Sequence, residues 1–415
     1  MGTIQVGYGD ERLDVELPPS LPVRLVEGTA PISSREGLAV VAEAVDNPLD
    51  APDLGELAAT AGTVAIVIPD GTRPAGAGTY LLPLIARLAR KGLTPDRMRL
   101  VIARGIHPAT PRPVVESMLG PELMSLFRPV QSAPGAHELN ATILDDPEIG
   151  PVRVHRHVAE ADLVVLTGGV MPHHLAGFGG GPKALVPGVA ERETIVAAHR
   201  LTLDALVRPD GSIRSAAGRT AGNSFHGALL RIARSFGRTW LLNVVLDAEG
   251  QIAAAAAGEV GAAHEAAIAK YKALYDWPEP EPADLVIAGT TGPPSTDLIQ
   301  CHKALLRASA WAQPGAPIVW AAPADHGPGH TALLPWFTAG KPPRHLMALR
   351  KDFHPYGLTA YSIKRLAKDH PVYIVSEMSR DLLRPMGLLP CKSLQAAVDL
   401  ACQENEVGSA VVLPR

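Results

Sequence analysis

Cysteine, aromatic residues and an excess of positive charge are all scarce in this chain of 415 residues. Its three cysteines form no CxxC pair, which excludes a structural zinc site made mainly of thiolates and argues against a disulfide framework. Aromatic residues make up only 4% of the chain, too few for a surface that stacks single-stranded nucleic acid. Because 38 Lys and Arg stand against 42 Asp and Glu, we expect neither a nucleic-acid partner nor binding to an anionic membrane.

Long hydrophobic runs are also absent. No apolar run approaches the roughly 18 residues that a transmembrane helix needs. Residues 1–18 carry charges at Asp10, Glu11, Arg12 and Asp14 and lack the apolar stretch of a signal peptide. The few scattered cysteines suit a reducing compartment. We therefore expect a cytoplasmic protein.

What the chain does contain is an alternation of short apolar runs and helical patterns. The runs 63–69, 97–103 and 162–167 are rich in Val, Ile and Leu, which is typical of strands buried on both faces. Between them, an apolar stripe over 78–91 predicts a helix. Strands that alternate with helices predict an α/β fold with a mostly parallel sheet covered on both sides.

A proline-rich segment, WPEPEP at 277–282, divides the chain, because prolines at alternate positions fit neither a helix nor a central strand. Before it we expect a hairpin over 240–256 and a helix over 259–274. After it the α/β pattern restarts. We therefore predict an N-terminal domain over 1–276, a linker over 277–282 and a C-terminal domain over 283–415. The later elements are expected at 284–288 (strand), 297–312 (helix), 318–321 (strand), 359–368 (helix), 372–375 (strand), 393–403 (helix) and 410–413 (strand).

Four segments that follow predicted strands or open a helix are candidates for chemistry, since ligands of open α/β sheets bind beyond the carboxyl ends of the strands. The first is Asp-Gly-Thr-Arg at 70–73, where Arg73 suits a carboxylate or phosphate and Asp70 would orient it. An ordinary exposed turn is the alternative, because Asp-Gly is a common turn pair. The second is Gly-Ile-His at 105–107. A lone histidine is more often structural than catalytic, but the position of His107 at a strand end favours a function.

The third segment, 171–183, combines His173 and His174 with three glycines and Lys183. Successive glycines let a backbone approach a ligand, their amides suit a phosphate, and a helix expected to start near 190 adds a favourable dipole. The segment is neither a Walker A loop nor GxGxxG. A glycine-rich loop with an exposed lysine would explain the glycines but not the histidines. His173, Lys183 and His199 within 27 residues instead indicate a metal or a covalent cofactor.

The fourth segment contains Gln300 and Lys303 in the first turn of a predicted helix. Residues three apart share a helix face, so the two side chains are able to grip one anion. A solvated first turn is the simpler alternative. Cys301 and His302 are adjacent and point apart on a helix, so a thiol nucleophile is not favoured.

Taken together and in order, these segments resemble the nickel-dependent lactate racemase family. The resemblance rests on DGTR at 70–73, G-x-H at 105–107, HHLAGFGGGPKALVPGVA at 173–190, and a histidine sixteen residues after Lys183. Gln300 with Lys303 extends it into the second domain, and GNSFH at 222–226 is similar to a further stretch of the family. The resemblance implies a two-domain α/β enzyme whose active site lies in the interdomain cleft and is completed by domain closure.

The family's cofactor is a nickel-pincer nucleotide, a pyridinium mononucleotide with two sulfur-bearing arms and a nickel ion. The resemblance implies a thioamide link to Lys183 and nickel ligation by His199, with Thr72, Gly179, Gly180 and Gly181 against the cofactor. Square-planar nickel with soft sulfur donors is chemically reasonable. Separate cofactor-synthesis enzymes are the implied protein partners, so a recombinant chain is able to lack the cofactor.

The implied reaction inverts the C2 centre of a 2-hydroxy acid by reversible hydride transfer to the cofactor, through a 2-keto acid. His107 and His173 would each serve one enantiomer as base. Lys183 joins them in the catalytic set as the cofactor tether. Asp70 would orient Arg73 or a histidine. The residues implied to hold the substrate are Arg73, Gln300, Lys303 and Asp70.

Departures from the family pattern leave the substrate open between lactate-like and malate-like acids. Pro108 stands where many members have Arg, and Ile299 stands where an aromatic residue would fit a small pocket. Arg104 or His174 would suit a second carboxylate, as malate requires. The alternatives are an epimerase of a sugar acid and a non-catalytic binding protein of the same fold. A nicotinamide-dependent dehydrogenase ranks lower because the chain lacks the GxGxxG unit.

Overall fold

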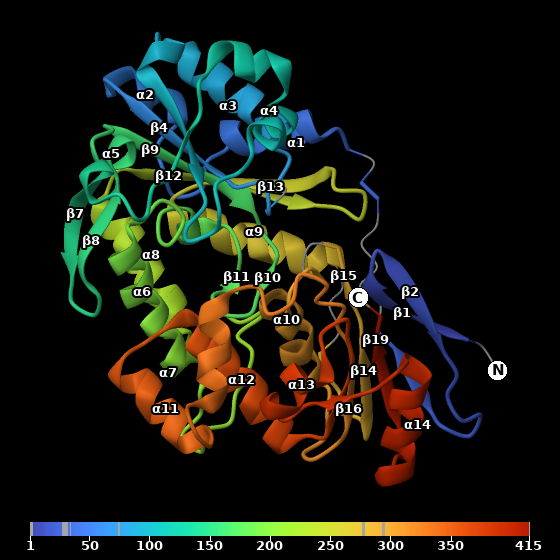
Figure 1. The fold of residues 1–415 in the computed structure, drawn as a ribbon. Coiled ribbons are helices and arrows are strands. Elements are labelled where there is room, and N and C mark those ends of the chain that lie inside the picture. Colours follow the sequence, from blue (N-terminus) through green and yellow to red (C-terminus); the bar gives the residue numbers. More distant parts are fainter. Residues whose placement is uncertain are drawn as a thin grey trace. The chain divides into compact units, whose positions relative to one another are not determined.

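The computed structural model describes residues 3–26, 32–33, 35–73, 75–275, 279–292 and 295–414. These residues form two compact units (Figure 1). Unit 1 comprises the described residues of 1–28, 206–215 and 277–415, and unit 2 those of 29–205 and 216–276. No helix in the described ranges has the length and apolar character to cross a membrane.

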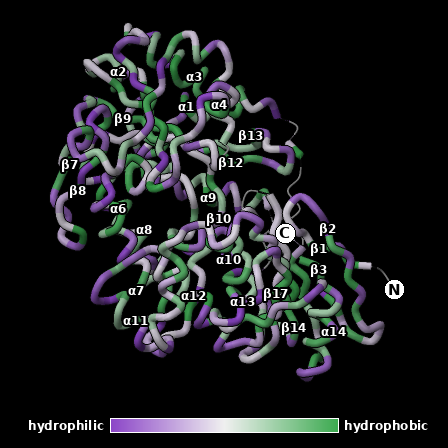
Figure 2. Tube along the Cα trace, in the orientation of Figure 1, coloured by the Kyte–Doolittle hydropathy of each residue, from purple (hydrophilic) through white to green (hydrophobic). Residues whose placement is uncertain are grey.

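Unit 2 is built on a six-stranded sheet with the strand order β13-β12-β9-β4-β5-β6. All neighbouring pairs are parallel except β12 and β13, which form the expected antiparallel hairpin. The Val- and Ile-rich runs thus become central strands, and hydrophobic colour follows them in Figure 2. The strands are β4 (Val64–Pro69), β5 (Met98–Ala103), β6 (Val130–Gln131), β9 (Leu163–Gly169), β12 (Thr239–Leu246) and β13 (Ile252–Gly258).

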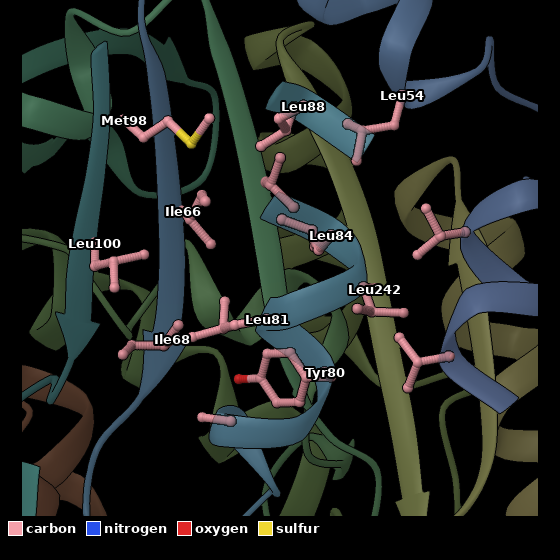
Figure 3. Packing of buried hydrophobic residues seen from close by; sticks show 14 of the residues in the cluster. Leu54, Ile66, Ile68, Tyr80, Leu81, Leu84, Leu88, Met98, Leu100 and Leu242 are labelled. Carbon is pink, nitrogen blue, oxygen red and sulfur yellow. The ribbon is translucent and has the colours of Figure 1, made fainter. Parts of the chain in front are cut away.

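Helices cover both faces of this sheet (Figure 1). One face packs against α1 (Gly37–Asp46), α2 (Leu54–Thr60), α3 (Ala77–Ala89) and α4 (Arg112–Leu126). The other packs against α5 (Arg156–Ala159), α6 (Arg192–Arg200), α8 (Ser224–Phe236) and α9 (Val260–Tyr275). Alternate residues of each strand feed the two cores, as the period of a strand requires. Figure 3 shows Leu81, Leu84 and Leu88 of α3 packed with strand residues such as Ile66 and Ile68.

Unit 2 also contains elements that the sequence did not predict. The hairpin of β7 (Asn140–Asp146) and β8 (Gly150–His155) forms a sheet of its own. A second small hairpin joins β10 (Pro172–His173) to β11 (Gly177–Phe178). Short helices complete the unit: η1 (Pro95–Arg97), η2 (His137–Leu139), η3 (Gly181–Ala184) and α7 (Thr202–Leu206), the last of which ends in unit 1.

Unit 1 contains a six-stranded, all-parallel sheet with the order β18-β17-β16-β14-β19-β3. Its strands are β3 (Val23–Leu25), β14 (Leu285–Ala288), β16 (Ile318–Ala321), β17 (Val372–Val375), β18 (Leu389–Pro390) and β19 (Ala410–Leu413). A smaller sheet has the order β15-β1-β2 and contains β1 (Ile4–Gly9), β2 (Glu11–Val15) and β15 (Thr290–Thr291). The helices are α10 (Leu298–Ala308), η5 (Thr331–Thr338), α11 (Pro342–Lys351), α12 (Pro355–Asp369), α13 (Arg380–Leu383), η6 (Arg384–Met386) and α14 (Leu394–Glu404).

The fold class is the α/β class expected from the sequence, with mostly parallel sheets in both units. The division of the chain differs from the predicted boundary. Residues 3–26 were assigned to the N-terminal domain, but β3 pairs with β19 and β1 pairs with β15, so this segment belongs to unit 1. Residues 206–215 also belong to unit 1. Of the predicted linker, Trp277 and Pro278 lie outside the described residues, and 279–282 form neither helix nor strand.

Candidate active site

The polar segments of unit 2 lie at one edge of its sheet. β4, β5 and β9 are adjacent parallel strands, so their carboxyl ends meet at the same edge. Residues 70–73 follow β4, residues 104–107 follow β5, and residues 170–173 follow β9. This is the position in which open α/β sheets bind their ligands.

Asp70 and His107 form a hydrogen-bonded pair across the ends of β4 and β5. Asp70 is 2% exposed, and its Oδ2 lies 2.7 Å from Nδ1 of His107. Its other oxygen, Oδ1, accepts hydrogen bonds from the hydroxyl and the backbone N–H of Thr72, at 2.6 and 3.1 Å. Both carboxylate oxygens are therefore held, and the orientation of the His107 ring is fixed.

The protonation of this pair follows from its surroundings. Burial raises the pKa of the Asp70 carboxyl, but hydrogen bonds from His107 and Thr72 outweigh it and leave the pKa below its ordinary value. Asp70 is therefore ionised at neutral pH, and an ionised carboxylate only accepts hydrogen bonds. Nδ1 of His107 must then carry a proton, so the lone pair of the neutral ring lies on Nε2. The His107 side chain is 35% exposed, which leaves its ring accessible.

Arg73 is a half-buried cation beside this pair. Its backbone N–H donates to the carbonyl of Asp70 at 3.0 Å. Burial lowers the pKa of the guanidinium, and the negative charge of Asp70 opposes that effect. An arginine keeps its charge even so. Among the residues that the structure describes, no salt bridge involves Arg73, so its fork of N–H donors is suited to a carboxylate from outside the protein.

Arg104 does something other than the sequence suggested. Its Nε donates to the carbonyl of Ser132 at 2.7 Å and its Nη1 to the carbonyl of His107 at 2.6 Å. The guanidinium thus joins the main chain of His107 to the main chain of Ser132, the residue that follows β6.

His173 carries its proton on the opposite nitrogen. The side chain is 8% exposed, and its Nδ1 accepts the backbone N–H groups of Leu175 and Ala176, each at 3.2 Å. A nitrogen that accepts two N–H groups bears no proton, so the neutral ring is protonated at Nε2. The neighbouring His174 ring stacks on it, with centroids 4.9 Å apart.

Of the three glycines 179–181, Gly180 and Gly181 are required by packing inside the protein. The N–H of Gly179 donates to Met171 O at 2.7 Å, and that of Gly181 donates to Oδ1 of Asn243 at 2.9 Å. A Cβ on Gly181 would lie 2.6 Å from the His264 ring, and one on Gly180 would lie 3.0 Å from the Asn243 amide. Two of the three amides are therefore engaged by the protein. Contact of these glycines with a cofactor stays a prediction.

Asn243 and His264 form a polar support under this loop. Asn243 Nδ2 donates to Gly168 O at 2.9 Å, so its Oδ1 accepts from Gly181 N–H and from Nδ1 of His264, which lies 2.8 Å away. His264 is 1% exposed, and burial, together with the charge of His226, lowers its pKa to about 3. The ring is neutral at physiological pH and acts as a fixed hydrogen-bond donor.

Lys183 and His199 lie around one aromatic ring. Lys183 is in η3, and its Nζ lies 5.9 Å from the centroid of the Phe225 ring. His199 is in α6, with its ring centroid 5.1 Å from that of Phe225. Phe225 itself is fully buried in the first turn of α8. The sequence did not single out Phe225.

The chemistry of His199 suits a metal ligand. Its Nδ1 donates to Ile195 O at 2.7 Å, which leaves the lone pair on Nε2. Burial, helped by the charge of Lys183, lowers its pKa to about 4, so the ring is neutral, as metal ligation requires. With Lys183 beside the same ring, the residues present fit a group bound to both an amine and an imidazole. The described residues contain no group of three or more His, Cys, Asp or Glu side chains placed to hold a metal ion.

Asn223 explains the segment GNSFH at 222–226. Its side chain caps α8 by accepting the N–H of His226 at 3.1 Å, and its Nδ2 donates to Leu175 O at 2.9 Å. The cap therefore ties the helix that carries Phe225 to the loop that orients His173. In the sequence, the segment was marked only by its similarity to a stretch of the family; an Asn that caps the following helix is a signal that could have identified this residue.

An acidic residue directly precedes the helix that follows the glycine-rich loop. α6 starts at Arg192, and the preceding Glu191 is buried, where its carboxylate accepts Arg153 Nε at 2.6 Å and lies 2.7 Å from His137 Nδ1. The N-terminus of α6, which was expected to favour a bound anion, is thus already next to the carboxylate of Glu191.

Gln300 and Lys303 lie in unit 1, on one face of α10. Lys303 Nζ donates to Oε1 of Gln300 at 2.5 Å, and Asp297 caps the helix by accepting the Gln300 N–H at 2.9 Å. Between them Cys301 is fully buried, and burial raises the pKa of its thiol to about 12. A thiol with that pKa is no nucleophile at neutral pH.

The structure thus brings Asp70, Thr72 and His107 into direct contact and puts Lys183 and His199 around Phe225. The positive charge of His107, when protonated, acts on His199, so these two groups of residues are neighbours in unit 2. The parts assigned to individual residues in binding or catalysis stay predictions.

The chain is similar to known proteins in both sequence and fold. A family model described as the lactate racemase N-terminal domain matches residues 8–207. The lactate racemase of Thermoanaerobacterium thermosaccharolyticum is 27% identical, over 97% of this chain and 94% of the relative. The lactate racemase of Lactiplantibacillus plantarum is 26% identical, over 90% of this chain and 88% of the relative.

Two solved structures are similar to this chain in fold. The lactate racemase apoprotein of T. thermosaccharolyticum superposes with a TM-score of 0.86 at 25% identity, covering 100% of this chain and 98% of that one. A protein from Thermotoga maritima shares the fold, with a TM-score of 0.64 at 16% identity over 88% of this chain and 97% of that one.

The fold and the site define an α/β protein that gathers an acid–base pair, a cation and a lysine at the carboxyl ends of parallel strands. Residues 8–207 match the lactate racemase N-terminal domain, and over most of its length the chain is similar to curated lactate racemases.

Proposed function

We propose that this chain is a racemase, and so an isomerase, that inverts the C2 centre of a 2-hydroxy acid. The observation that carries the proposal is the Asp70–His107 pair, which leaves an unprotonated Nε2 on an accessible ring beside the half-buried cation of Arg73. A base beside a carboxylate-binding cation is what removal of a hydroxyl proton from a hydroxy acid requires. The relatives named lactate racemase support this activity class.

His107 would take the hydroxyl proton at Nε2. The Asp70 carboxylate holds the ring through Nδ1 at 2.7 Å and stabilises the imidazolium that forms. Loss of the C2 hydrogen as hydride would need an acceptor that no side chain supplies; together with loss of the hydroxyl proton it would turn the C–O bond into a carbonyl and give a 2-keto acid. Return of the same hydride to the opposite face, with return of a proton to oxygen, would give the other enantiomer.

His173 is the proposed proton-transfer residue for the second enantiomer. In this structure its Nε2 carries the proton, so it presents a hydrogen-bond donor to an oxygen of the substrate. To accept a further proton, the ring would have to release Nδ1 from the N–H groups of Leu175 and Ala176. The two histidines therefore start from different protonation states.

Lys183 and His199 are the proposed attachment points of the nickel-pincer nucleotide, Lys183 through a thioamide and His199 through Nε2 on nickel. When bound, the cofactor would supply the hydride acceptor that no side chain provides. The neutral His199 ring and the neighbouring amine support this assignment. The cofactor-synthesis enzymes would be partners of the chain, and a cytoplasmic location stays a prediction.

Arg73 would bind the substrate carboxylate, and Gln300 with Lys303 would add N–H donors to the carboxylate or to the developing carbonyl. A malate-like substrate would need a further cation for its second carboxylate. Arg104 already binds the main chain at Ser132 and His107, which argues against Arg104 in that role, and His174 stays the other candidate. An epimerase of a sugar acid is compatible with the same residues.

The test is the cofactor and the activity together. The chain should be produced with the cofactor-synthesis enzymes and analysed by intact mass and metal content, beside a Lys183→Ala variant. We expect a mass increment that Lys183→Ala lacks, about one nickel per chain, and racemisation of at least one single-enantiomer 2-hydroxy acid in a panel that includes lactate and malate.

A positive control from a curated lactate racemase must be loaded in the same cells. If that control carries nickel and this chain carries neither adduct nor nickel, the racemase proposal fails and a binding protein of the same fold takes its place. If the chain is loaded but turns over no hydroxy acid, the cofactor assignment stands and the substrate class is wrong.

A further inference from the structure

We propose that Arg104 is a positioning residue that fixes the base His107 against the loop carrying Lys183. The inference rests on the proposed racemase function, since it concerns how the proton-transfer residue is held. It adds a residue that the function itself does not require.

The turn that carries His107 is closed by its own backbone. The N–H of His107 donates to Arg104 O at 2.9 Å, which makes a four-residue turn directly after β5. Gly105 occupies its second position with φ of +53°, a conformation that glycine adopts at little cost. β5 and its sheet pairing end at Ala103, so residues 104–107 have no neighbouring strand. Contacts from outside the sheet must therefore hold this turn in place.

Arg104 provides those contacts through three donors. Its backbone N–H donates to Ser132 Oγ at 3.2 Å and its Nε to Ser132 O at 2.7 Å. Its Nη1 donates to His107 O at 2.6 Å. One planar guanidinium therefore bridges the last residue of the turn and the residue that follows β6, and a planar fork fixes both the distance and the direction of its bonds.

The same residues reach the lysine loop. Ser132 Oγ donates to Gly188 O at 3.1 Å, and Gly105 N–H donates to the same carbonyl at 2.9 Å. Gly188 N–H in turn donates to Lys183 O at 3.0 Å. The turn that carries His107 and the loop that carries Lys183 thus both bind Gly188. A shift of the turn would therefore change the distance between His107 and Lys183.

A small displacement of a catalytic base has a large effect on the rate of the reaction. A reacting group displaced by about 1 Å costs about 100-fold in rate. Loss of the Arg104 bonds would release the His107 carbonyl and weaken the 2.7 Å bond from Nδ1 to Asp70. The expected result is a loss in kcat, because the substrate carboxylate is bound elsewhere.

If Arg104 instead bound a second carboxylate of the substrate, its removal would affect KM and not kcat. It would raise KM for a dicarboxylate and leave a monocarboxylate unaffected. The two roles therefore separate in one kinetic comparison.

The first experiment uses the cofactor-loaded chain with Arg104→Gln and Arg104→Lys, assayed on every acid that the wild-type chain racemises. Arg104→Gln should lower kcat about 100-fold and change KM less than about threefold, on mono- and dicarboxylates alike. Arg104→Lys should recover part of kcat, since an ammonium is able to make one of the two bonds. The control is Arg97→Gln, because Arg97 Nε also donates to a carbonyl, that of Gly62 at 2.7 Å, outside the site. A change confined to KM for a dicarboxylate, or no change at all, would overturn the proposal.

The second experiment needs no activity. In protein labelled with ¹⁵N-histidine, the His107 Nδ1–H resonance is identified among the fifteen histidines by its loss in His107→Gln. A proton held by Asp70 should be shifted downfield and protected from exchange. Arg104→Gln should abolish that signal, and Arg97→Gln should leave it. If the signal survives in Arg104→Gln, Arg104 does not position His107, whether or not the chain proves to be a racemase.

Discussion

The two histidines of the site hold their protons on different ring nitrogens, and the backbone and side chains around them decide this. A carboxylate faces Nδ1 of His107, whereas two amide N–H groups face Nδ1 of His173. One ring therefore presents a lone pair at Nε2 and the other presents an N–H. Two chemically identical side chains are made unequal by neighbours that lie within four residues or on the adjacent strand.

Replacing Asp70 by Asn should remove the base while keeping the shape of the site. An Asn amide is able to donate to Nδ1 of His107, which would move the ring proton to Nε2 and block the proposed base. We expect kcat to fall by a factor of about 10² to 10⁴, the range typical of a lost general base. Steady-state racemisation by the loaded chain measures this. Thr72→Ser keeps the hydroxyl that donates to Asp70 and should retain activity. Full activity of Asp70→Asn would contradict the assignment.

Single residues were predictable where the strand-end position marks them. Asp70, Arg73 and His107 follow runs whose composition alone predicts buried strands, so their common edge followed from the sheet. Phe225 was not predictable, because a buried aromatic residue in a helix is ordinarily part of the core. The reason for the glycines at 180 and 181 was also hidden, since it depends on Asn243 and His264 from distant β12 and α9.

At the scale of elements, β12 and α9 hold the glycine-rich loop in place through one polar side chain each. Asn243 accepts the N–H of Gly181, and the His264 ring fills the space that a Cβ on Gly181 would occupy. The support sets the position of η3, which begins at Gly181 and contains Lys183.

Gly181→Ala should therefore disturb both stability and cofactor loading. The φ of +56° costs an alanine about 1 kcal/mol, and the clash with His264 adds about 1–3 kcal/mol. The matched control is Gly218→Ala, where φ is +80° but nothing lies within 4 Å of the new Cβ. Urea denaturation compares the two, and intact mass gives the loading. Equal losses in both variants would show that the clash is relieved by a small shift.

The start of α2 should show a pH-dependent contribution from Asp53. Its Oδ1 caps the helix by accepting the N–H of Gly55 and Glu56, and its Oδ2 accepts Arg87 Nε at 3.1 Å. Burial opposes these bonds, but the net effect lowers the pKa of Asp53. Because the carboxylate is favoured in the folded state, its stabilisation is present above the unfolded pKa of about 4 and is lost as the pH falls through the lower, folded value.

Asp53→Asn, which keeps a capping oxygen, should cost about 0.2–1 kcal/mol at pH 7 and less at pH 3. Asp53→Ala should cost about 1 kcal/mol more because the cap is lost too. Urea denaturation at both pH values measures these differences. An Asn penalty that grows toward pH 3 would mean that folding raises the pKa of Asp53 instead of lowering it.

The parallel strands were predictable as elements, because each is a short Val- and Ile-rich run between turns. The hairpins β7–β8 and β10–β11 were not. The strands β10 and β11 have two residues each, too short for a period to be recognised, and β7 is only partly buried, so its alternation is weak. β1 and β2 pair with each other, but they were missed because IQVGYG and ERLDV contain no Val- and Ile-rich run. β3 was missed because it has three residues and pairs with β19 at the far end of the chain.

At the scale of the whole molecule, the chain forms two units with separate cores, and residues 3–26 contribute to unit 1. Val6, Val15 and Leu17 are buried in one cluster with residues of β14, β16, β19 and α14. The C-terminal end lies beside β1, where Gly7 N–H donates to Pro414 O at 2.8 Å (Figure 1). Long-range pairing of this kind leaves no local pattern, which is why the domain boundary from the sequence placed this segment with the wrong neighbours.

Val6→Ala should loosen unit 1 selectively. Val6 is fully buried, and removal of two methyl groups costs about 2 kcal/mol. Hydrogen exchange by mass spectrometry should speed up in 285–291 and 410–413 and stay unchanged in β4 and β9. Val41→Ala, at a fully buried position of α1 in unit 2, should give the opposite pattern. Faster exchange in both units from either variant would indicate that they unfold as one.

The pairing of β3 with β19 sets an order for folding during synthesis. Every strand of the large sheet of unit 2 has been made once residue 258 has left the ribosome, so that sheet is able to close early. β1 and β2 pair with each other near the start of the chain, whereas β3 pairs with β19 and so waits until residue 413 has emerged. Throughout translation, therefore, β3 lacks its strand partner, and Val6 and Val15 of the paired strands β1 and β2 lack the cluster in which they are finally buried. These strands are the part of the nascent protein on which a chaperone has the longest time to act.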